Sequence, residues 1–219
     1  MAPSKDDEFY MTFVTLQVED TLFKVPRQTL EAQSPVFRDM FSLPPPPDVE
    51  VDGSSDEHPI VLPEPVQAID FRRLLKVLLL PTSFVGPRLP KGDHDAWISV
   101  LKLSRMWEME ELRVLALRHL KYPTGWKSAA EKLALALKHE IRDWIVPGVN
   151  ELAKRPEPIS VEDAQILGLE TALKVAAVRE SLVTDGLRLI AGCRIATNVD
   201  FTQIIKEIFG LYASTPNAQ

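Results

Sequence analysis

The sequence predicts an α+β fold: a small three-stranded sheet with a cluster of short helices, followed by an α-helical C-terminal extension. Three observations lead to this prediction. Residues 14–25 alternate apolar and polar side chains on both sides of a short turn, which is typical of a β-hairpin. Residues 60–62 form a second β-prone run between two prolines and fit an edge strand. From residue 69 almost to the end, apolar side chains recur at helical spacing.

The first element is the hairpin. Residues 14–18 form its first strand, Glu19-Asp20 makes the turn, and residues 22–25 return. Pro26 closes the second strand because proline has no amide hydrogen to donate to a ladder. A three-stranded sheet this small leaves edges that a partner chain could cover.

Two short helices are expected next. Residues 27–33 carry mostly straight-chain side chains, which lose little rotamer freedom in a helix. Ser34-Pro35 is a helix-start signal, because serine caps the first amides and proline suits the first helical position. This second helix is expected to end near Leu43.

A proline-rich acidic loop follows, over residues 44–65. It holds 7 of the chain's 18 prolines and six acidic side chains, with no lysine or arginine. Like charges repel and proline lacks an amide donor, so the part through about Glu57 is predicted to be mobile. Residues 60–62 within it could add the edge strand to the hairpin.

The rest of the chain is predicted to be helical. Pro147-Gly148 is expected to break one helix, and the capping box Ser160-x-x-Asp163 is expected to begin another. A Pro/Gly connector is expected over residues 81–92. The expected helices are residues 69–80, an antiparallel pair at 96–107 and 112–120, and then 127–146, 160–182 and 199–212.

Composition excludes several classes of protein. The chain has 31 acidic and 25 basic residues and a formal charge of -6, which disfavours direct binding of nucleic acid. No apolar run approaches the ~20 residues of a membrane helix, and the N-terminus lacks the features of a signal peptide. Cys193 is the single cysteine, as is common in a reducing compartment, so we expect an intracellular protein of the nucleus or cytoplasm.

No motif for catalysis, metal binding or cofactor binding stands out. The nucleophile elbow and the glycine-rich phosphate and dinucleotide loops are absent from the sequence. His139-Glu140 begins like a zinc-protease motif, but Asp143 stands where the second histidine is needed. The segment 92–95 fits the start of a helix better than a metal loop, and Cys193 is expected to be inert. We therefore predict no catalytic residue, no metal and no cofactor.

Residues 14–37 resemble the opening of a BTB/POZ domain, with a hairpin, a short helix and then Ser-Pro-x-Phe. The resemblance covers about residues 9–121, and several strings look particularly like the BTB-domain proteins of basidiomycete fungi. It implies a flexible N-terminus at 1–8, a BTB/POZ domain at 9–121 with the acidic loop at 44–57 inside it, a helical extension at 122–212 and a flexible tail at 213–219.

The resemblance also implies a function. BTB domains commonly pair through the first strand and first helix around a two-fold axis. For Leu30 and Phe37, a role in the core alone is the alternative. The candidate oligomer interface that follows is Phe13, Val14, Leu30 and Phe37. The candidate partner groove lies at the end of the second short helix and consists of Met40, Phe41 and Leu43.

The chain departs from the family pattern at three places. Phe13 replaces an aspartate that many animal members carry before the first strand, and Pro26 replaces a histidine before the first helix. The hydrophobic-x-Glu contact of ubiquitin-ligase adaptors would fall in the acidic loop, where only Val49-Glu50 is nearby.

The sequence therefore predicts a non-catalytic protein–protein interaction module that forms homo- or hetero-oligomers. The expected partner is a second copy or another BTB protein, with no direct contact to nucleic acid or membrane. The alternatives are a substrate adaptor of a cullin-RING ubiquitin ligase, which would bind a cullin scaffold, and a transcriptional regulator scaffold. A small enzyme is the third class, and it would need convergent ionisable groups in a cleft.

Overall fold

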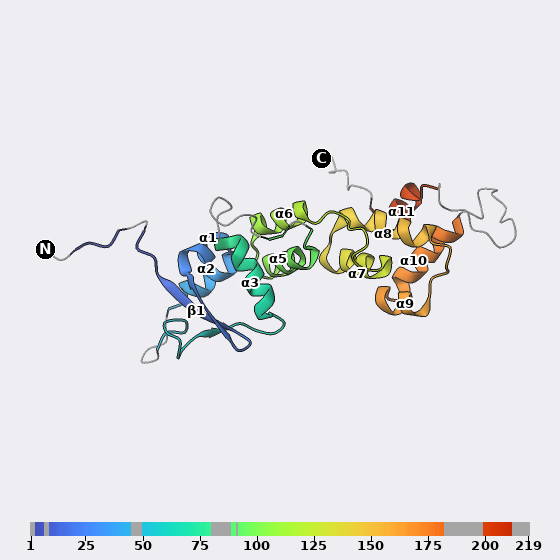
Figure 1. Ribbon diagram of the computed structural model, residues 1–219. Helices are drawn as coiled ribbons and strands as arrows, with labels where there is room; N and C mark the ends of the chain where they lie inside the picture. The colour runs from blue at the N-terminus through green and yellow to red at the C-terminus, as the bar shows by residue number, and fades with distance from the viewer. Residues whose placement is uncertain are drawn as a thin grey trace. The chain divides into compact units, whose positions relative to one another are not determined.

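The computed structural model describes residues 3–6, 9–44, 50–79, 89–90, 92–181 and 199–211. The chain divides into two compact units, Met1–Leu120 and Lys121–Gln219. The first unit contains a small sheet and several helices, and the second is built from helices in the part described (Figure 1).

Three short strands form the sheet of the first unit, in the order β2-β1-β3. Strand β1 (Phe13–Val18) pairs antiparallel with β2 (Thr21–Pro26) and parallel with β3 (Ile60–Val61). Leu16, at the centre of the sheet, lies opposite Phe23 and beside the first residue of β3, and it is fully buried. The predicted hairpin and edge strand are confirmed.

The turn of the hairpin also caps a helix. Glu19 adopts the left-handed conformation, with φ 52°. Its Oε2 accepts a hydrogen bond of 3.0 Å from the backbone N–H of Ala68. Ala68 begins α3 (Ala68–Leu79), and the first amides of a helix have no partner within the helix. The hairpin therefore satisfies the start of a helix far along the chain.

Helices α1 (Arg27–Gln33) and α2 (Pro35–Ser42) meet at Ser34, as predicted. The Ser34 side chain is fully buried, and its Oγ accepts a hydrogen bond of 3.1 Å from the N–H of Phe37. The same hydroxyl donates to the carbonyl oxygen of Trp107 at 2.6 Å. One side chain thus caps α2 and ties it to a distant helix.

The acidic loop differs from the prediction over the part that is described. Residues 45–49 lie outside the described residues, but residues 50–57, which were expected to be mobile, are held against β1. The backbone N–H of Thr15 donates to the carbonyl of Gly53 at 2.9 Å, and its hydroxyl donates to Asp56 at 3.2 Å. Gly53 has a φ of 83°, which glycine adopts without strain, so the loop can turn tightly at the sheet.

Helices α3, α5 (His94–Met106) and α6 (Glu110–His119) are the other helices in the described part of the first unit. Helix α3 packs on α5, and α5 packs on α6. The expected end of α3 at Leu80 and the expected connector through residue 88 lie outside the described residues.

An aromatic cluster occupies the centre of the first unit. The ring of Phe71 lies 5.0 Å from that of Phe23 and 5.7 Å from that of Trp107, both in edge-on contacts. The ring of Phe37 lies 5.0 Å from that of Trp107. The sheet, α2, α3 and the end of α5 therefore share one core.

The predicted single helix over residues 127–146 is wrong. The structure has two helices there, α7 (Ala129–His139) and α8 (Arg142–Lys154). The chain turns at Glu140, which adopts φ 54°, and Pro147-Gly148, the expected break, lies inside α8.

The physical reason is that helical spacing continues across the reversal. Ile141 begins the turn into α8 and is buried, so it extends the apolar stripe of the preceding helix as if no turn were present. Gly148 lies against α7, where an added Cβ would be 3.5 Å from the Cβ of Leu133. Its small size allows α8 to pack closely on α7.

The capping box of Ser160 and Asp163 is confirmed, but the helix that it begins is shorter than predicted. Helix α9 (Val161–Leu167) stops at Gly168, and α10 (Leu169–Glu180) follows at once. Gly168 has φ 78° and ψ 154°, a conformation that is essentially restricted to glycine.

The final helix is also shorter than predicted. Helix α11 (Thr202–Ile208) lies within the expected range of 199–212, of which Tyr212 is outside the described residues. Phe201 and Ile205 are buried, so the helix docks as expected. The backbone N–H of Phe201 donates to the side chain of Asn150 in α8 at 3.3 Å.

Candidate interaction surface

The four residues predicted for an oligomer interface are not all at the surface. Phe13 is 53% exposed, whereas Val14, Leu30 and Phe37 are 4%, 0% and 1% exposed. Val14 is covered by the loop at Gly53, where an added Cβ would lie 2.6 Å from Val14 Cγ2, and Leu30 and Phe37 are the buried residues of α1 and α2. Phe13 is the one of the four that offers a side chain to a second chain.

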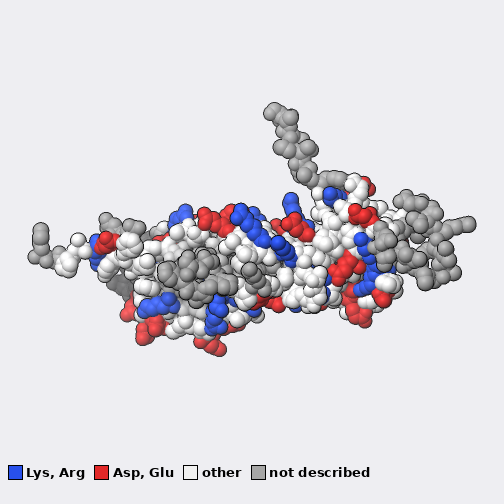
Figure 2. All heavy atoms as spheres, turned by 45° about the horizontal axis from the view of Figure 1, so that its top comes forward, with Lys and Arg blue, Asp and Glu red and all other residues white. Residues whose placement is uncertain are grey.

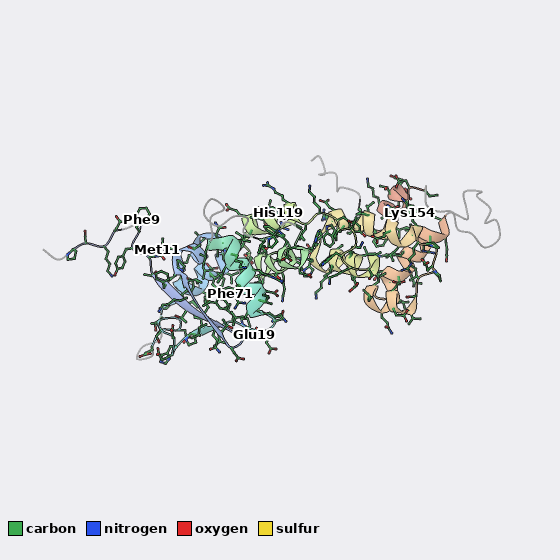
Figure 3. The ribbon with its side chains drawn as sticks, in the orientation of Figure 1. Phe9, Met11, Glu19, Phe71, His119 and Lys154 are labelled. Atoms are coloured by element: carbon green, nitrogen blue, oxygen red, sulfur yellow. The ribbon has the colours of Figure 1, made fainter. Side chains whose placement is uncertain are left out.

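Phe13 belongs to a longer exposed segment that sequence reasoning missed. We call the side chains of Phe9, Tyr10, Met11 and Phe13 the apolar arm; they are 71%, 54%, 51% and 53% exposed. Figure 3 shows Phe9 and Met11 on the stretch that leads away from the helices of the first unit, while Phe71 lies among them. Neighbouring exposed large apolar residues are the signal that could have identified the arm.

The inner end of the arm is anchored to α1. The backbone N–H of Arg27 donates to the carbonyl of Thr12 at 2.9 Å, and the backbone N–H of Thr12 donates to Oε1 of Gln28 at 3.2 Å. Farther out, the backbone N–H of Phe9 donates to Asp6 at 2.7 Å. The arm therefore leaves the sheet in a defined direction.

A groove of about 700 Å³ lies beside Phe13. Its apolar lining includes Phe13 at the start of β1, Ile60 in β3, and Met40, Phe41 and Leu43 at the end of α2. All three residues predicted for a partner groove thus line one hollow together with Phe13. Leu43 is 69% exposed, and Met40 and Phe41 are half-buried.

The rim of the groove is acidic. Glu50 and Asp52 line it, and Glu50 pairs with the imidazole of His58 at 2.7 Å. The nearby basic group, Arg27, is engaged inside: it pairs with Glu31 at 2.8 Å and donates to the carbonyl of Phe41 at 2.8 Å. The groove therefore fits an apolar side chain better than an acidic one.

A second hollow, of about 820 Å³, lies between α1, the end of α3 and α6. Thr29 and Ala32 lie one turn apart on α1, and their small side chains do not fill the hollow. Its other walls include Val77, Leu112 and Arg118. Sequence reasoning did not find it, although small side chains at helical spacing are a signal for such a gap.

Charged side chains are mixed over the visible face of the molecule. Figure 2 shows blue and red groups interspersed there. In the acidic loop, the carboxylate of Glu57 accepts a hydrogen bond from its own backbone N–H and a second one from Ser55. Both bonds lower the pKa of Glu57. This visible face has no broad basic patch of the kind that binds nucleic acid.

The motifs weighed for chemistry have structural roles where they are described. Asp93 caps α5 by accepting from the N–H of Ala96 at 2.9 Å. His119 stacks on Trp97, with ring centroids 4.1 Å apart. Among the described residues there is no group of three or more His, Cys, Asp or Glu side chains that could hold a metal ion. Cys193 lies outside the described residues.

One cluster of ionisable groups was not expected. Lys132, which is 2% exposed, contacts Glu151 at 2.6 Å and the carbonyl of Pro123 at 3.3 Å. The Tyr122 hydroxyl donates to the same Glu151 carboxylate, and burial together with this bond raises the pKa of Tyr122 well above its usual range. These groups satisfy one another, so the cluster holds residues 122–123 against α7 and α8.

None of the described helices is both long and apolar enough to span a membrane. A search of curated proteins found no match to this chain. A family model, described as the BTB/POZ domain, matches residues 5–123. The match includes the three-stranded sheet and the helices of the first unit, and BTB domains are protein–protein interaction modules that self-associate and bind partners such as cullins. Because the match covers more than half of the chain, this protein belongs to the BTB/POZ domain family.

Proposed function

We propose that this chain is a non-catalytic protein–protein interaction module whose BTB/POZ domain self-associates through the apolar arm and the adjoining groove. The observation that carries the proposal is the exposure of four large apolar side chains within residues 9–13. Burying one such side chain completely contributes about 1.5–3 kcal/mol, and more than half of each is available here. A few anchors of this kind dominate the energy of a typical interface of about 1,600 Å².

The partner that we favour is a second copy of the chain. Phe13 stands where many animal members of the family carry an aspartate, so an interface built here is more apolar than one built around that aspartate. Under a two-fold axis the arm of each copy would lie on the other, and Phe13 would meet an apolar surface rather than water. Pairing with a different BTB protein would use the same residues.

The test is the solution mass of the full chain, measured by light scattering over a dilution series. We expect a mass of at least twice 24.6 kDa, and Phe13→Glu is expected to lower it at equal concentration. Leu22→Glu is the matched control, because Leu22 is 47% exposed and lies on the same hairpin at its opposite end. A monomer at every concentration would overturn self-association. An equal change in mass for Phe13→Glu and Leu22→Glu would show that the apolar arm is not part of the interface.

The adaptor and transcriptional-scaffold functions have less support. The hydrophobic-x-Glu contact of an adaptor would fall near Val49-Glu50. Val49 lies outside the described residues, and Glu50 is paired with His58. A monomeric protein that co-purifies with a cullin scaffold would favour the adaptor over the homo-oligomer.

A further inference from the structure

Exposed apolar side chains gather on two consecutive helices of the second unit. Val161 and Ile166 in α9 are 70% and 44% exposed, and Leu169 and Leu173 in α10 are 71% and 60% exposed. Among the described residues of this unit, Leu137 is the one further large apolar side chain that is exposed to a similar degree, at 37%. In the described part of the second unit, the exposed large apolar side chains are therefore concentrated on α9 and α10, the orange helices of Figure 1.

On α10 the exposed residues form a continuous line. Leu169, Leu173 and Ala177 are spaced four residues apart and are all exposed; we call them the α10 stripe. Val175 and Val178 are buried on the other side of the helix, which packs on α8. The α10 stripe is thus a second apolar face of the helix, on the side away from the residues that pack on α8.

An ion pair flanks the α10 stripe. Glu170 and Lys174 lie one turn apart, and their charged groups are 2.6 Å apart. Two copies of α10 that cross antiparallel, with the axis near Ala172, would place each Glu170 opposite the partner's Lys174. In the same register, each Leu173 would enter the gap between Leu169 and Leu173 of the other copy.

We infer that the α10 stripe is a self-association surface, separate from the BTB domain, on which a second copy of this chain packs its own α10 stripe antiparallel. The charge order and the spacing of the leucines favour the same register, which makes the face complementary to itself. Glu170 and Glu180 are exposed acidic groups on α10, and they disfavour an anionic lipid surface as the occupant.

The first experiment uses light scattering of the full chain in four forms: unmodified, Phe13→Glu, Leu173→Glu and both together. Two interfaces on one chain predict a mass above the dimer that grows with concentration. Leu173→Glu is expected to lower the mass at high concentration to that of the dimer, and in the Phe13→Glu background it is expected to convert the remaining dimer into monomer. Leu137→Glu is the control within the same unit. An unmodified chain and a Leu173→Glu variant of equal mass, in both backgrounds, would overturn the inference.

The arrangement of variants also separates this surface from the proposed BTB contact. If the BTB domain does not self-associate, the unmodified chain is a dimer that Phe13→Glu leaves intact and Leu173→Glu dissociates. If the α10 stripe does not self-associate, Leu173→Glu changes nothing. The midpoint of thermal unfolding checks that each variant is folded.

A charge exchange provides the second test and needs no change in the apolar residues. Glu170→Lys alone, or Lys174→Glu alone, sets like charges against each other across the interface and is expected to weaken association. The double variant Glu170→Lys with Lys174→Glu restores the opposite pairs between the two copies, so it is expected to recover the mass of the unmodified chain. No loss in the single variants, or no recovery in the double variant, would contradict an antiparallel pair of α10 helices.

Discussion

Replacing Ser34 by alanine is expected to destabilise the first unit far more than the loss of one hydroxyl at the surface would. The buried Oγ of Ser34 accepts a hydrogen bond from the N–H of Phe37 and donates one to the carbonyl of Trp107. Losing an N-cap serine costs about 0.5–2 kcal/mol. Removing the donor from a buried carbonyl costs about 1–3 kcal/mol. The expected total is therefore about 1.5–5 kcal/mol, a large part of the roughly 5–15 kcal/mol that stabilises a typical domain.

The assay is urea unfolding followed by tryptophan fluorescence, with the midpoint and the slope measured for each variant. The matched control is Ser42→Ala, because Ser42 is exposed at the end of α2 and its hydroxyl donates to the carbonyl of Asp39 at 2.7 Å. We expect the control to change the free energy of unfolding by no more than about 0.5 kcal/mol. Equal midpoints for Ser34→Ala and Ser42→Ala would refute the double role of Ser34. A changed slope would indicate an altered denatured state instead.

Three further substitutions test other contacts. Glu19→Ala removes the cap on the N–H of Ala68 and is expected to cost about 1 kcal/mol in urea unfolding, with no effect if that bond is absent in solution. Gly168→Ala places a side chain at φ 78° and ψ 154°, and it is expected to lower the free energy of unfolding by about 1–3 kcal/mol. The added Cβ would have no atom within 4 Å, so the cost is backbone strain and not a clash. An unchanged urea midpoint would mean that the backbone relaxes freely. The guanidinium of Arg155 lowers the pKa of Asp163, so the stability from this pair is complete above the ordinary aspartate value of about 3.9 and is lost as the pH falls below it. Asp163→Asn should flatten that acid dependence of the unfolding midpoint, and parallel acid curves for the two proteins would contradict the assignment.

Much of the local structure could be predicted from the sequence because its signals act over a few residues. Ser34-Pro35 predicts the start of α2, and Ser160 with Asp163 predicts the start of α9, because a cap needs only the next three residues. Alternation along residues 14–25 predicts the hairpin for the same reason. The family pattern lies in this stretch, so the fold of the first unit followed from it.

The candidate interaction surface could be predicted only in part. Met40, Phe41 and Leu43 line the groove as a group because they are close in sequence. Leu30 and Phe37 were candidates for the surface and are instead core residues, because helices packed from later in the chain cover them. Periodicity shows that a helix or strand has an apolar face to bury, but it does not show whether that face packs on the core of its own chain or on a second chain.

Only the tertiary structure decided where the chain reverses and which apolar groups stay in contact with water. Apolar residues recur at helical spacing through Ile141, whether the chain continues as one helix or turns at Glu140. The spacing persists because α7 and α8 each bury the face that carries these residues. Residues 50–57 have the composition of a mobile loop, yet hydrogen bonds from Thr15 hold them to the sheet. The amino-acid sequence by itself determined the hairpin, the starts of α2 and α9 and the family, since these depend on short-range backbone and side-chain preferences. Burial was decided by contacts between residues tens of positions apart, for which the sequence carries no local signal.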